Sequence, residues 1–505
     1  MTRILANKYF AALLVVVAVA AEFGLASVSH PTALAGPKEP AAARAAVSAA
    51  VRACPGPGSA APTASGVALA AASAGGTGKA EVSRLSPAGA ASVPSPLTAL
   101  AHPGELALVN VPVAHPLAKG TTGASGASST SVTTVPARGG VMISASGSLA
   151  RGLEAEQTTP SGMGTAQCQG PGTDFWFIGP GQKPVGEIRL YLMNTDNQTA
   201  DASVQVLTDS GPVLGGTDSG ISVPPHGIVM QSLAGLLKGS RVISLNVTTS
   251  VGRVSAAVLE TTNAANPGTW LPPALPPAKT QVLPGLPNTP GSRELYVAVP
   301  GSNNAQLKVT AVTGKGSFQP TGGTGIDLPG GSAVAVALPS LGGIPAAIQV
   351  SSNVPVTASM LAAGGQAGAP GAFTAASAPV QEQGVIAGNP PLSGGATALI
   401  LSAPHAAARV RVAEIAAAGS PPTAAPKVVQ VPAGHSEVVP LSPPRRGGRT
   451  FAFGIVVTPL SGSGPVYAGR VVSQNGVARS ILLMPSSLTW VPLPAVRNSM
   501  TSARS

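Results

Sequence analysis

The tightest pair of carboxylates in the chain is Glu154 and Glu156, in the run Gly152-Leu153-Glu154-Ala155-Glu156. Two carboxylates that flank a cleft are the machinery of a glycosidase, one as general acid and the other as base or nucleophile. On a strand both side chains would point to one face, but two solvated carboxylates explain the spacing equally well. A sugar cleft also needs an aromatic wall and tuned pKa values, which the sequence does not locate. We therefore favour the solvated interpretation.

The six histidines suggest no metal site by their spacing. None lies within ten residues of another, so the chain has no His-x-x-x-His pair of the kind that binds zinc. His226 and His435 stand at near-equivalent positions of a repeated turn, where we expect exposed turn residues. The chain also lacks a Gly-x-Ser-x-Gly elbow, a P-loop and a GxGxxG that follows a strand. We therefore expect no catalysis, no bound metal and no cofactor.

The N-terminal segment has the features of an export signal. Arg3 and Lys8 precede an apolar run at 9–21, which is the order of a charged n-region and an apolar h-region. A small-x-small site at 33–35 has the form that a signal peptidase cuts. The apolar stretch also continues to Val28, which is long enough for an uncleaved anchor. Both alternatives place the rest of the chain outside the cytoplasm.

The chain has two cysteines, Cys54 and Cys168. Structural disulfides are rare in cytosolic proteins and common in exported ones. An exported chain with two cysteines most simply pairs them, and the bridge would close a loop of about 115 residues. Two inert buried thiols are the alternative.

The positive charge does not indicate a nucleic-acid-binding protein. The net charge is +11, but the one tight basic group is Arg445, Arg446 and Arg449, and aromatic residues are only 3% of the chain. Binding of single-stranded nucleic acid requires a basic groove with aromatic side chains for stacking. We interpret the arginine group as a solvated loop, with a weak attraction to anionic envelope polymers as the remaining functional hypothesis.

From Cys168 onward the chain repeats one unit three times. Two landmarks recur about one hundred residues apart: a strand-like run that starts at Leu190, Leu295 and Leu399, and a turn at Pro224, Pro329 and Pro432. Within each copy apolar residues alternate with period two, as half-buried strands require. Six or seven short strands in such a unit are typical of an Ig-like sandwich. The low charged fraction of 9% excludes a coiled coil.

These patterns predict an all-β protein of tandem antiparallel Ig-like β-sandwich repeats after an N-terminal signal or anchor helix. We expect the four rings of Phe175-Trp176-Phe177 and Tyr191 in the core of the first sandwich, and we interpret the Pro-rich stretch 272–290 as a linker. The predicted segments are a signal peptide or transmembrane anchor at 1–36, an Ala/Gly/Pro-rich region with a few strands at 37–167, β-sandwich repeats at 168–275, 276–380 and 381–495, and a disordered tail at 496–505.

One stretch is more specific than composition: Cys168-Gln169-Gly170-Pro171-Gly172-Thr173-Asp174-Phe175-Trp176-Phe177-Ile178-Gly179. Together with Arg52-Ala53-Cys54-Pro55-Gly56 and the repeated sandwich pattern, it resembles the actinobacterial family known as domain of unknown function 5719. The resemblance implies an exported or membrane-anchored envelope protein with no assigned activity, and it supplies no catalytic residues. Members of the family are similar in keeping both cysteine motifs, which favours a bridge between Cys54 and Cys168.

We therefore expect a non-catalytic extracytoplasmic envelope protein, membrane-anchored or secreted, that binds or scaffolds through its tandem sandwiches. Its expected partners are an envelope protein or a cell-wall polymer, and the membrane through the N-terminal segment, but not nucleic acid. The alternative is a carbohydrate-active enzyme or an accessory glycan-binding module of the cell wall. A passive spacer is a third possibility.

Overall fold

The computed structural model describes residue 17 and residues 44–56, 65–71, 76–92, 96–100, 106–111, 139–158, 165–213, 220–261, 268–341, 343–362, 372–389, 394–417 and 419–493. Ala46–Trp490 forms one compact unit, and the two chain ends, Met1–Ala45 and Val491–Ser505, form another. The expected signal or anchor at 1–36, apart from Val17, and the expected tail at 496–505 lie outside the described residues. None of the described helices has the length and apolar character needed to cross a membrane.

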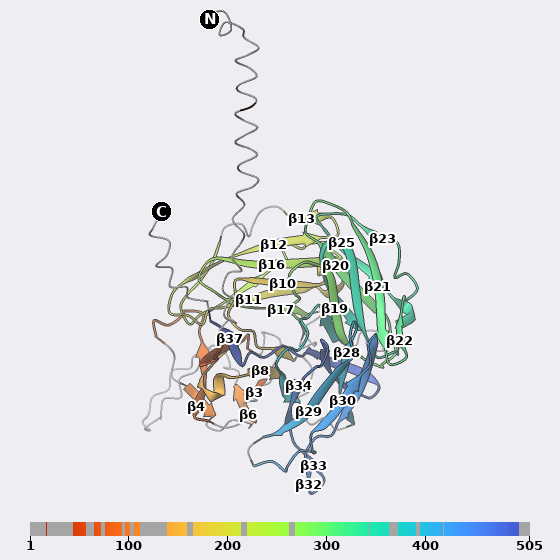
Figure 1. Ribbon diagram of the computed structural model, residues 1–505. Coiled ribbons are helices and arrows are strands. Elements are labelled where there is room, and N and C mark those ends of the chain that lie inside the picture. The colour runs from red at the N-terminus through yellow and green to blue at the C-terminus, as the bar shows by residue number, and fades with distance from the viewer. Residues whose placement is uncertain are drawn as a thin grey trace, which may run out of the picture. The chain divides into compact units, whose positions relative to one another are not determined.

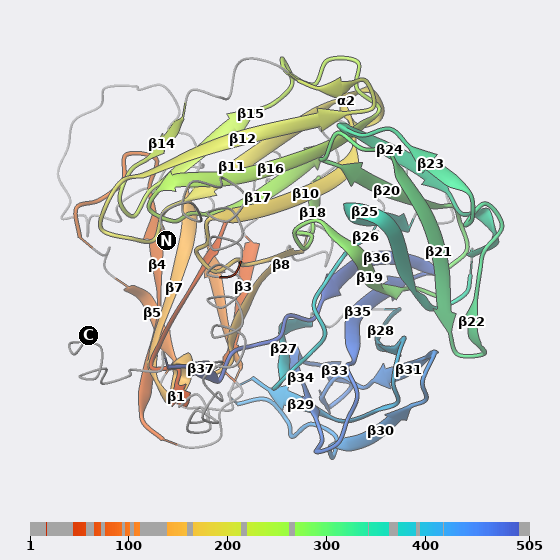
Figure 2. The ribbon, with the colours of Figure 1, turned by 45° about the horizontal axis from the view of Figure 1, so that its top comes forward.

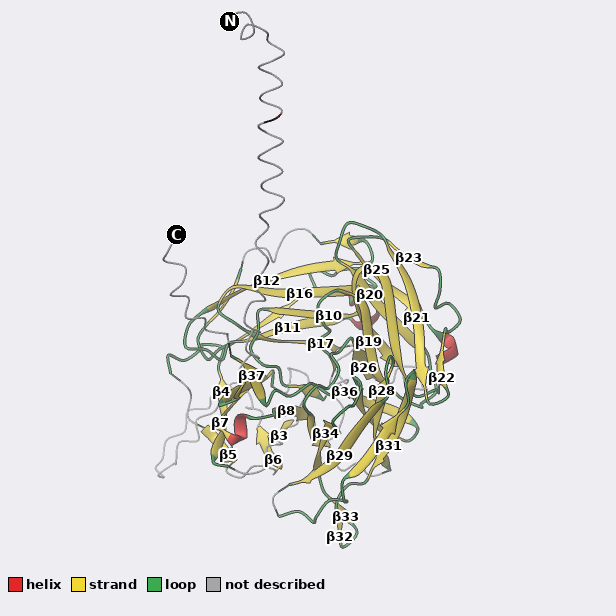
Figure 3. Ribbon diagram, in the orientation of Figure 1, coloured by secondary structure: helices red, strands yellow, loops and turns green. Residues whose placement is uncertain are grey.

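The described elements are almost all antiparallel strands, which confirms the all-β prediction (Figure 3). The exceptions are single turns of helix, such as α2 (Gln182–Val185). The strands form where side chains alternate between core and solvent. The apolar positions predicted to face inward in the first repeat, such as Ile243, Leu245 and Val247, are all fully buried.

The N-terminal region forms a sandwich of two four-stranded sheets, with strand orders β2-β7-β4-β5 and β6-β3-β8-β9. Its strands are β2 (Ala49–Cys54), β3 (Ser65–Ala71), β4 (Gly78–Leu85), β5 (Pro96–Leu100), β6 (Leu106–Val111), β7 (Gly140–Gly147), β8 (Leu153–Thr158) and β9 (Ala166–Gln167). A separate two-stranded sheet pairs β1 (Arg44–Ala46) with β37 (Trp490–Pro492).

The first repeat also consists of two sheets. One has the order β10-β16-β12-β13, with β14 paired to β12, and the other has the order β15-β11-β17-β18. Its strands are β10 (Asp174–Pro180), β11 (Glu187–Met193), β12 (Ala200–Thr208), β13 (Gly211–Pro212), β14 (Ile221–Val223), β15 (Ile228–Ser232), β16 (Val242–Val251), β17 (Ser255–Thr261) and β18 (Thr269–Leu271).

The second repeat differs because one long strand, β25, runs through both of its layers (Figure 2). β25 pairs with β19 and β21 in one half and with β20 and β26 in the other. Its strands are β19 (Ala278–Leu286), β20 (Arg293–Val299), β21 (Ala305–Thr313), β22 (Gly316–Phe318), β23 (Ile326–Leu328), β24 (Ser332–Ala337), β25 (Ala346–Ala362) and β26 (Ala372–Ala375).

The third repeat returns to two four-stranded sheets, β27-β34-β29-β30 and β31-β28-β35-β36, and adds a small hairpin of β32 and β33. Its strands are β27 (Gly384–Asn389), β28 (Gly395–Ala403), β29 (Ala408–Ala416), β30 (Lys427–Val431), β31 (His435–Leu441), β32 (Arg445–Arg446), β33 (Arg449–Thr450), β34 (Phe453–Pro459), β35 (Tyr467–Gln474) and β36 (Val477–Leu483).

The N-terminal sandwich matches the first repeat strand for strand. β2-β7-β4-β5 corresponds to β10-β16-β12-β14, and β6-β3-β8-β9 corresponds to β15-β11-β17-β18. The region 37–167, for which the sequence predicts only a few strands, therefore contains a fourth unit with the two-sheet topology of the first repeat.

The Pro-rich stretch at 272–290 is not a linker, so this interpretation was wrong. β19 (Ala278–Leu286) lies within it, pairs with β25 and buries its last six residues. Pro284 falls where the register shifts between Leu283 and Leu286. Because proline lacks only the N–H donor, it is tolerated at such an irregularity in the ladder.

Apolar clusters join the four sandwiches in a closed series, each sandwich to two others. The N-terminal sandwich shares clusters with the first and third repeats, and the second repeat shares clusters with the same two. The N-terminal sandwich contributes Met142 to the cluster that holds Tyr191 of repeat one, and Ala70 to the cluster that holds Val385 of repeat three. Repeat two contributes Tyr296 to the cluster that holds Phe177 of repeat one, and Ile348 to the cluster that holds Ile481 of repeat three.

Repeats two and three approach each other closely at two glycines. A Cβ atom on Gly469 of β35 would lie 2.7 Å from the Cα atom of Gly285 of β19. That distance is too short for two carbon atoms, so the backbones meet only because neither residue has a side chain. The repeats are therefore fused rather than separate sandwiches.

Candidate functional site

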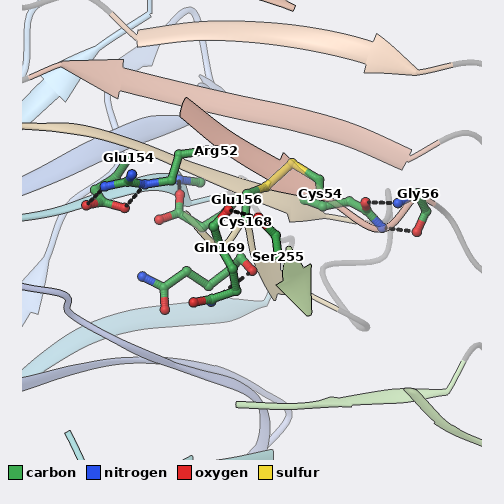
Figure 4. The surroundings of a disulfide bond; sticks show 11 residues. Arg52, Cys54, Gly56, Glu154, Glu156, Cys168, Gln169 and Ser255 are labelled. Atoms are coloured by element: carbon green, nitrogen blue, oxygen red, sulfur yellow. Dashed lines mark hydrogen bonds and ion pairs between the residues drawn. A yellow bond between two sulfur atoms is a disulfide. The ribbon is translucent and has the colours of Figure 1, made fainter. Parts of the chain in front are cut away.

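A disulfide joins Cys54 and Cys168, as predicted, with their Cα atoms 4.4 Å apart (Figure 4). Cys54 ends β2 in one sheet of the N-terminal sandwich, and Cys168 follows β9 of the other sheet. Both cysteines are buried in the core of this sandwich. The disulfide therefore links the two sheets of the N-terminal sandwich at the residues that precede the first repeat.

The residues next to the disulfide continue this connection. Ala53 and Gln169 exchange two backbone hydrogen bonds, with N···O distances of 2.8 and 3.0 Å. The hydroxyl of Ser255, on β17 of the first repeat, donates to the carbonyl oxygen of Gln169 at 3.1 Å (Figure 4). The disulfide thus lies beside the junction of the N-terminal sandwich and the first repeat.

Glu154 is not a solvated carboxylate, so the favoured interpretation of the acidic pair was wrong. Its side chain is 3% exposed and forms a two-point ion pair with the guanidinium of Arg52, at 2.9 and 3.1 Å (Figure 4). Burial lowers the pKa of Arg52, but the charge and hydrogen bonds of Glu154 outweigh this effect and hold that pKa above its ordinary value. The pair joins β2 to β8.

Glu156 lies on the same face of β8 and is also buried, but its partners come from the third repeat. One carboxylate oxygen accepts a hydrogen bond from the backbone N–H of Gly388 on β27, and Arg470 of β35 supplies a nearby positive charge. Burial raises the pKa of Glu156 to about 8, against the effects of Arg470 and Gly388. Burial also lowers the pKa of Arg470 to about 10.

The predicted geometry of the acidic pair is therefore present, but its surroundings are not those of a sugar cleft. The carboxylates share one face because they are two residues apart on a strand, and the third repeat covers that face. A glycosidase needs both carboxylates to reach a bound sugar. Glu154 and Glu156 instead stabilise contacts within and between sandwiches.

Glu156 should make the stability of the protein fall as the pH rises. Its carboxyl group has a pKa of about 8 in the fold against 4.5 as the ordinary value, so the folded chain holds a proton that the unfolded chain releases between these values. The resulting stability is complete below pH 4.5 and is lost as the pH rises through 8. Between pH 6 and 7.5 the free energy of unfolding should fall by about 2 kcal/mol from this group.

The variant Glu156→Gln should remove this part of the pH dependence, because glutamine keeps an oxygen for the Gly388 N–H and does not titrate. Urea unfolding at pH 6 and pH 7.5 measures the difference. Glu187→Gln, at a half-exposed position of β11, is the matched control and should follow the wild type. Parallel curves for the wild type and Glu156→Gln would contradict the assignment.

A small cavity lies where the N-terminal sandwich meets the first and third repeats. Its walls include Gln169, Phe177, Trp270 and Leu483, and its volume is about 30 Å³. That space holds about two water molecules, whereas sites for small-molecule ligands measure roughly 300–1,000 Å³. The cavity is a packing feature and not a sugar-binding cleft.

The structure corrects the expectation that His226 is an exposed turn residue. Its side chain is buried, with Nε2 2.6 Å from Oδ1 of Asn197. Its φ of 47° is positive, as are those of Gly331 (70°) and Gly434 (74°) at the equivalent turns of the other two repeats. His435 stands one residue after that position and is half-buried. In the described part of the chain, no three His, Cys, Asp or Glu residues gather as a metal site would require.

Two ionisable residues that the sequence analysis missed lie in these interfaces. Arg470 is fully buried and bonds to Ser480 and to the carbonyl of Gly388. Glu260 of β17 is also buried, and burial raises its pKa well above the ordinary value. A charged residue inside an otherwise apolar strand was the available signal in both cases.

Other predicted residues fall where their chemistry suggests. Of the four rings expected in the core of the first sandwich, Trp176 and Phe177 lie there and Phe175 is half-buried against it. Tyr191 is buried instead in the cluster shared with the N-terminal sandwich, where it packs edge-on against Trp270 with ring centroids 5.2 Å apart. The arginines of the predicted solvated loop form the exposed hairpin of β32 and β33 (Figure 1).

Comparison with known proteins gives one family and no assigned activity. No curated protein matches the chain. Among solved structures, the crystal structure of a GH78 family rhamnosidase of Bacillus sp. GL1 is similar at 11% sequence identity over 64% of this chain, with a TM-score of 0.10. The chain spans about half the length of that protein, 55%, and a score so low carries no inference about fold or activity. Residues 121–442 match a family of unknown function, DUF5719. This match covers more than half of the chain, and the protein therefore belongs to the DUF5719 family.

Proposed function

We propose that this protein is a non-catalytic extracytoplasmic envelope protein that binds or scaffolds through four fused β-sandwiches. The observation that carries the proposal is the closed series of buried contacts that joins each sandwich to two others. Sandwiches on separate linkers would present their loops at variable distances. Buried interfaces instead hold the loops and strand edges in a constant arrangement, which suits the binding of a large partner.

Two features support a place outside the cytoplasm. The N-terminal sequence has a charged region followed by an apolar run, as export signals do. The disulfide between Cys54 and Cys168 is of the kind that persists in oxidising compartments.

The surroundings of the acidic residues support a binding role over a carbohydrate-active enzyme. Glu154 and Glu156 are engaged by Arg52 and by the third repeat, and the cavity between the sandwiches holds only about two water molecules. The closed series of contacts also argues against a passive spacer, because an extended chain of units would span a greater distance with the same number of residues.

The proposal predicts that the full chain, purified in a nonionic detergent, captures a specific component from detergent-solubilised envelope of the native organism. Capture should be saturable, should persist at moderate salt and should be lost after heat unfolding of the bait. Bound proteins and glycans are both analysed. Release of a new product from the glycans would support the enzyme instead, and no saturable capture would leave the spacer as the better explanation.

A further inference from the structure

The three repeats present the same two outward positions on equivalent strands, but only the third fills both with arginine. In β12, β21 and β29 the side chains alternate between core and solvent. The pairing of each strand with the one that ends before the repeated turn aligns Ala200, Ala305 and Ala408. The outward pairs that follow are Asp201 and Ser203 in the first repeat, Gln306 and Lys308 in the second, and Arg409 and Arg411 in the third.

The strand itself does not require these arginines. Val410 and Val412, on the inward side of β29, are buried in the core of the third repeat. The equivalent strands of the other repeats form without arginine at the outward positions. Arg409 and Arg411 are exposed, and the residues opposite them on neighbouring strands are Gln430, Val428 and Thr458.

A second group of arginines occurs where the third repeat departs from the other two. The connections that follow β15 and β24 are compact and bury leucines, such as Leu237 and Leu341. The connection that follows β31 instead extends into the hairpin of β32 and β33, which projects beyond β29 and β30 (Figure 1). Arg445, Arg446 and Arg449 on this hairpin are all exposed.

The charge of the three repeats differs accordingly. Residues 168–275 contain 5 basic and 7 acidic residues, residues 276–380 contain 4 and 2, and residues 381–495 contain 8 and 3. The net charges are therefore −2, +2 and +5. Within the described part of the third repeat, no salt bridge joins the exposed cations Arg409, Arg411, Lys427, Arg445, Arg446 and Arg449 to a carboxylate.

We propose that this arginine face, defined as Arg409, Arg411 and the hairpin arginines, binds a linear cell-wall polymer that carries phosphodiester groups. Guanidinium groups donate paired hydrogen bonds to phosphate oxygens, and unpaired exposed cations at successive outward positions suit a repeating anion. The flanking Gln430 and Thr458 add polar contacts, whereas a lipid surface would need large apolar side chains that insert. This inference names one partner for the proposed binding function and rests on it.

The test uses the full chain in nonionic detergent and immobilised poly(glycerol phosphate). The variant Arg409→Ser with Arg411→Gln places uncharged polar residues at two exposed positions, so its thermal unfolding should match the wild type. Its affinity should fall about tenfold, and the slope of log K against log salt should fall by about two units. Adding Ser substitutions at Arg445, Arg446 and Arg449 should abolish binding. Lys308→Gln with Lys315→Ser removes two exposed charges from the second repeat and is the matched control, with affinity unchanged.

Three results would overturn the inference: no binding of the polymer by the wild type, equal loss in the control variant, or tighter binding to phosphatidylglycerol vesicles than to the polymer. The envelope capture experiment separates this failure from that of the proposed function. If the Arg409→Ser, Arg411→Gln variant still captures the envelope component, the scaffold function stands and the arginine face is not its binding site. If neither protein captures anything, both proposals fail.

Discussion

Replacement of Cys54 and Cys168 by alanine should lower the free energy of unfolding of the N-terminal sandwich by about 5 kcal/mol. The two cysteines are separated by 114 positions, and a bridge across so long a loop removes much of the conformational entropy of the unfolded chain. The loop contains nearly the whole N-terminal sandwich, so this unit should be the first to open.

Hydrogen exchange of the amides in β3 and β8 measures this effect directly. Exchange of the amides in β21 is the internal control, because this strand lies in the second repeat. Reduction of the wild-type protein should reproduce the result for the alanine variant. Unchanged exchange in β3 and β8 after either treatment would show that packing alone maintains this sandwich.

Replacement of Arg52 by alanine should destabilise the protein by about 3–5 kcal/mol. The substitution leaves the carboxylate of Glu154 buried, at 3% exposure, without its counter-charge. Breaking a buried pair costs more than the pair contributes, because the remaining charge has lost its water and has no partner. The free energy of unfolding from urea titration at pH 7 is the measurement.

Arg189 provides the matched control for Arg52. It forms the same type of ion pair with Glu187, but the two side chains are 27% and 36% exposed, so Arg189→Ala should cost no more than about 1 kcal/mol. The double variant Arg52→Ala with Glu154→Ala should recover part of the loss, because no buried charge remains. Equal losses for Arg52→Ala and Arg189→Ala would mean that water reaches Glu154 in solution.

The strands of the repeats were predictable because the required information is local. Alternation such as Ala408-Arg409-Val410-Arg411-Val412 shows which side chains face inward without reference to any distant residue. The N-terminal unit escaped recognition as a fourth sandwich because its strands are rich in small residues, as in Ser65–Ala71. Small side chains give a weak apolar signal even where the backbone follows the same path.

The environment of the candidate site was not predictable in this way. Glu154 and Glu156 do share a face of one strand, as their spacing implies, but the sequence does not say that Arg52 pairs with the first and that the third repeat covers the second. The prediction that His226 is exposed was wrong for the same reason, because the burial of its side chain depends on Asn197 and on the packing around its turn.

By itself, therefore, the sequence determined the all-β class, the repeating unit and the two cysteines that pair, because periodicity, spacing and residue type act over short stretches of chain. Only the tertiary structure decided that the sandwiches close on one another, that the acidic pair is buried in their contacts and that Arg409 and Arg411 remain exposed. The burial of a side chain and its pKa depend on which distant parts of the chain pack against it. The free energy of that packing is a sum over many long-range contacts, which no local sequence pattern encodes.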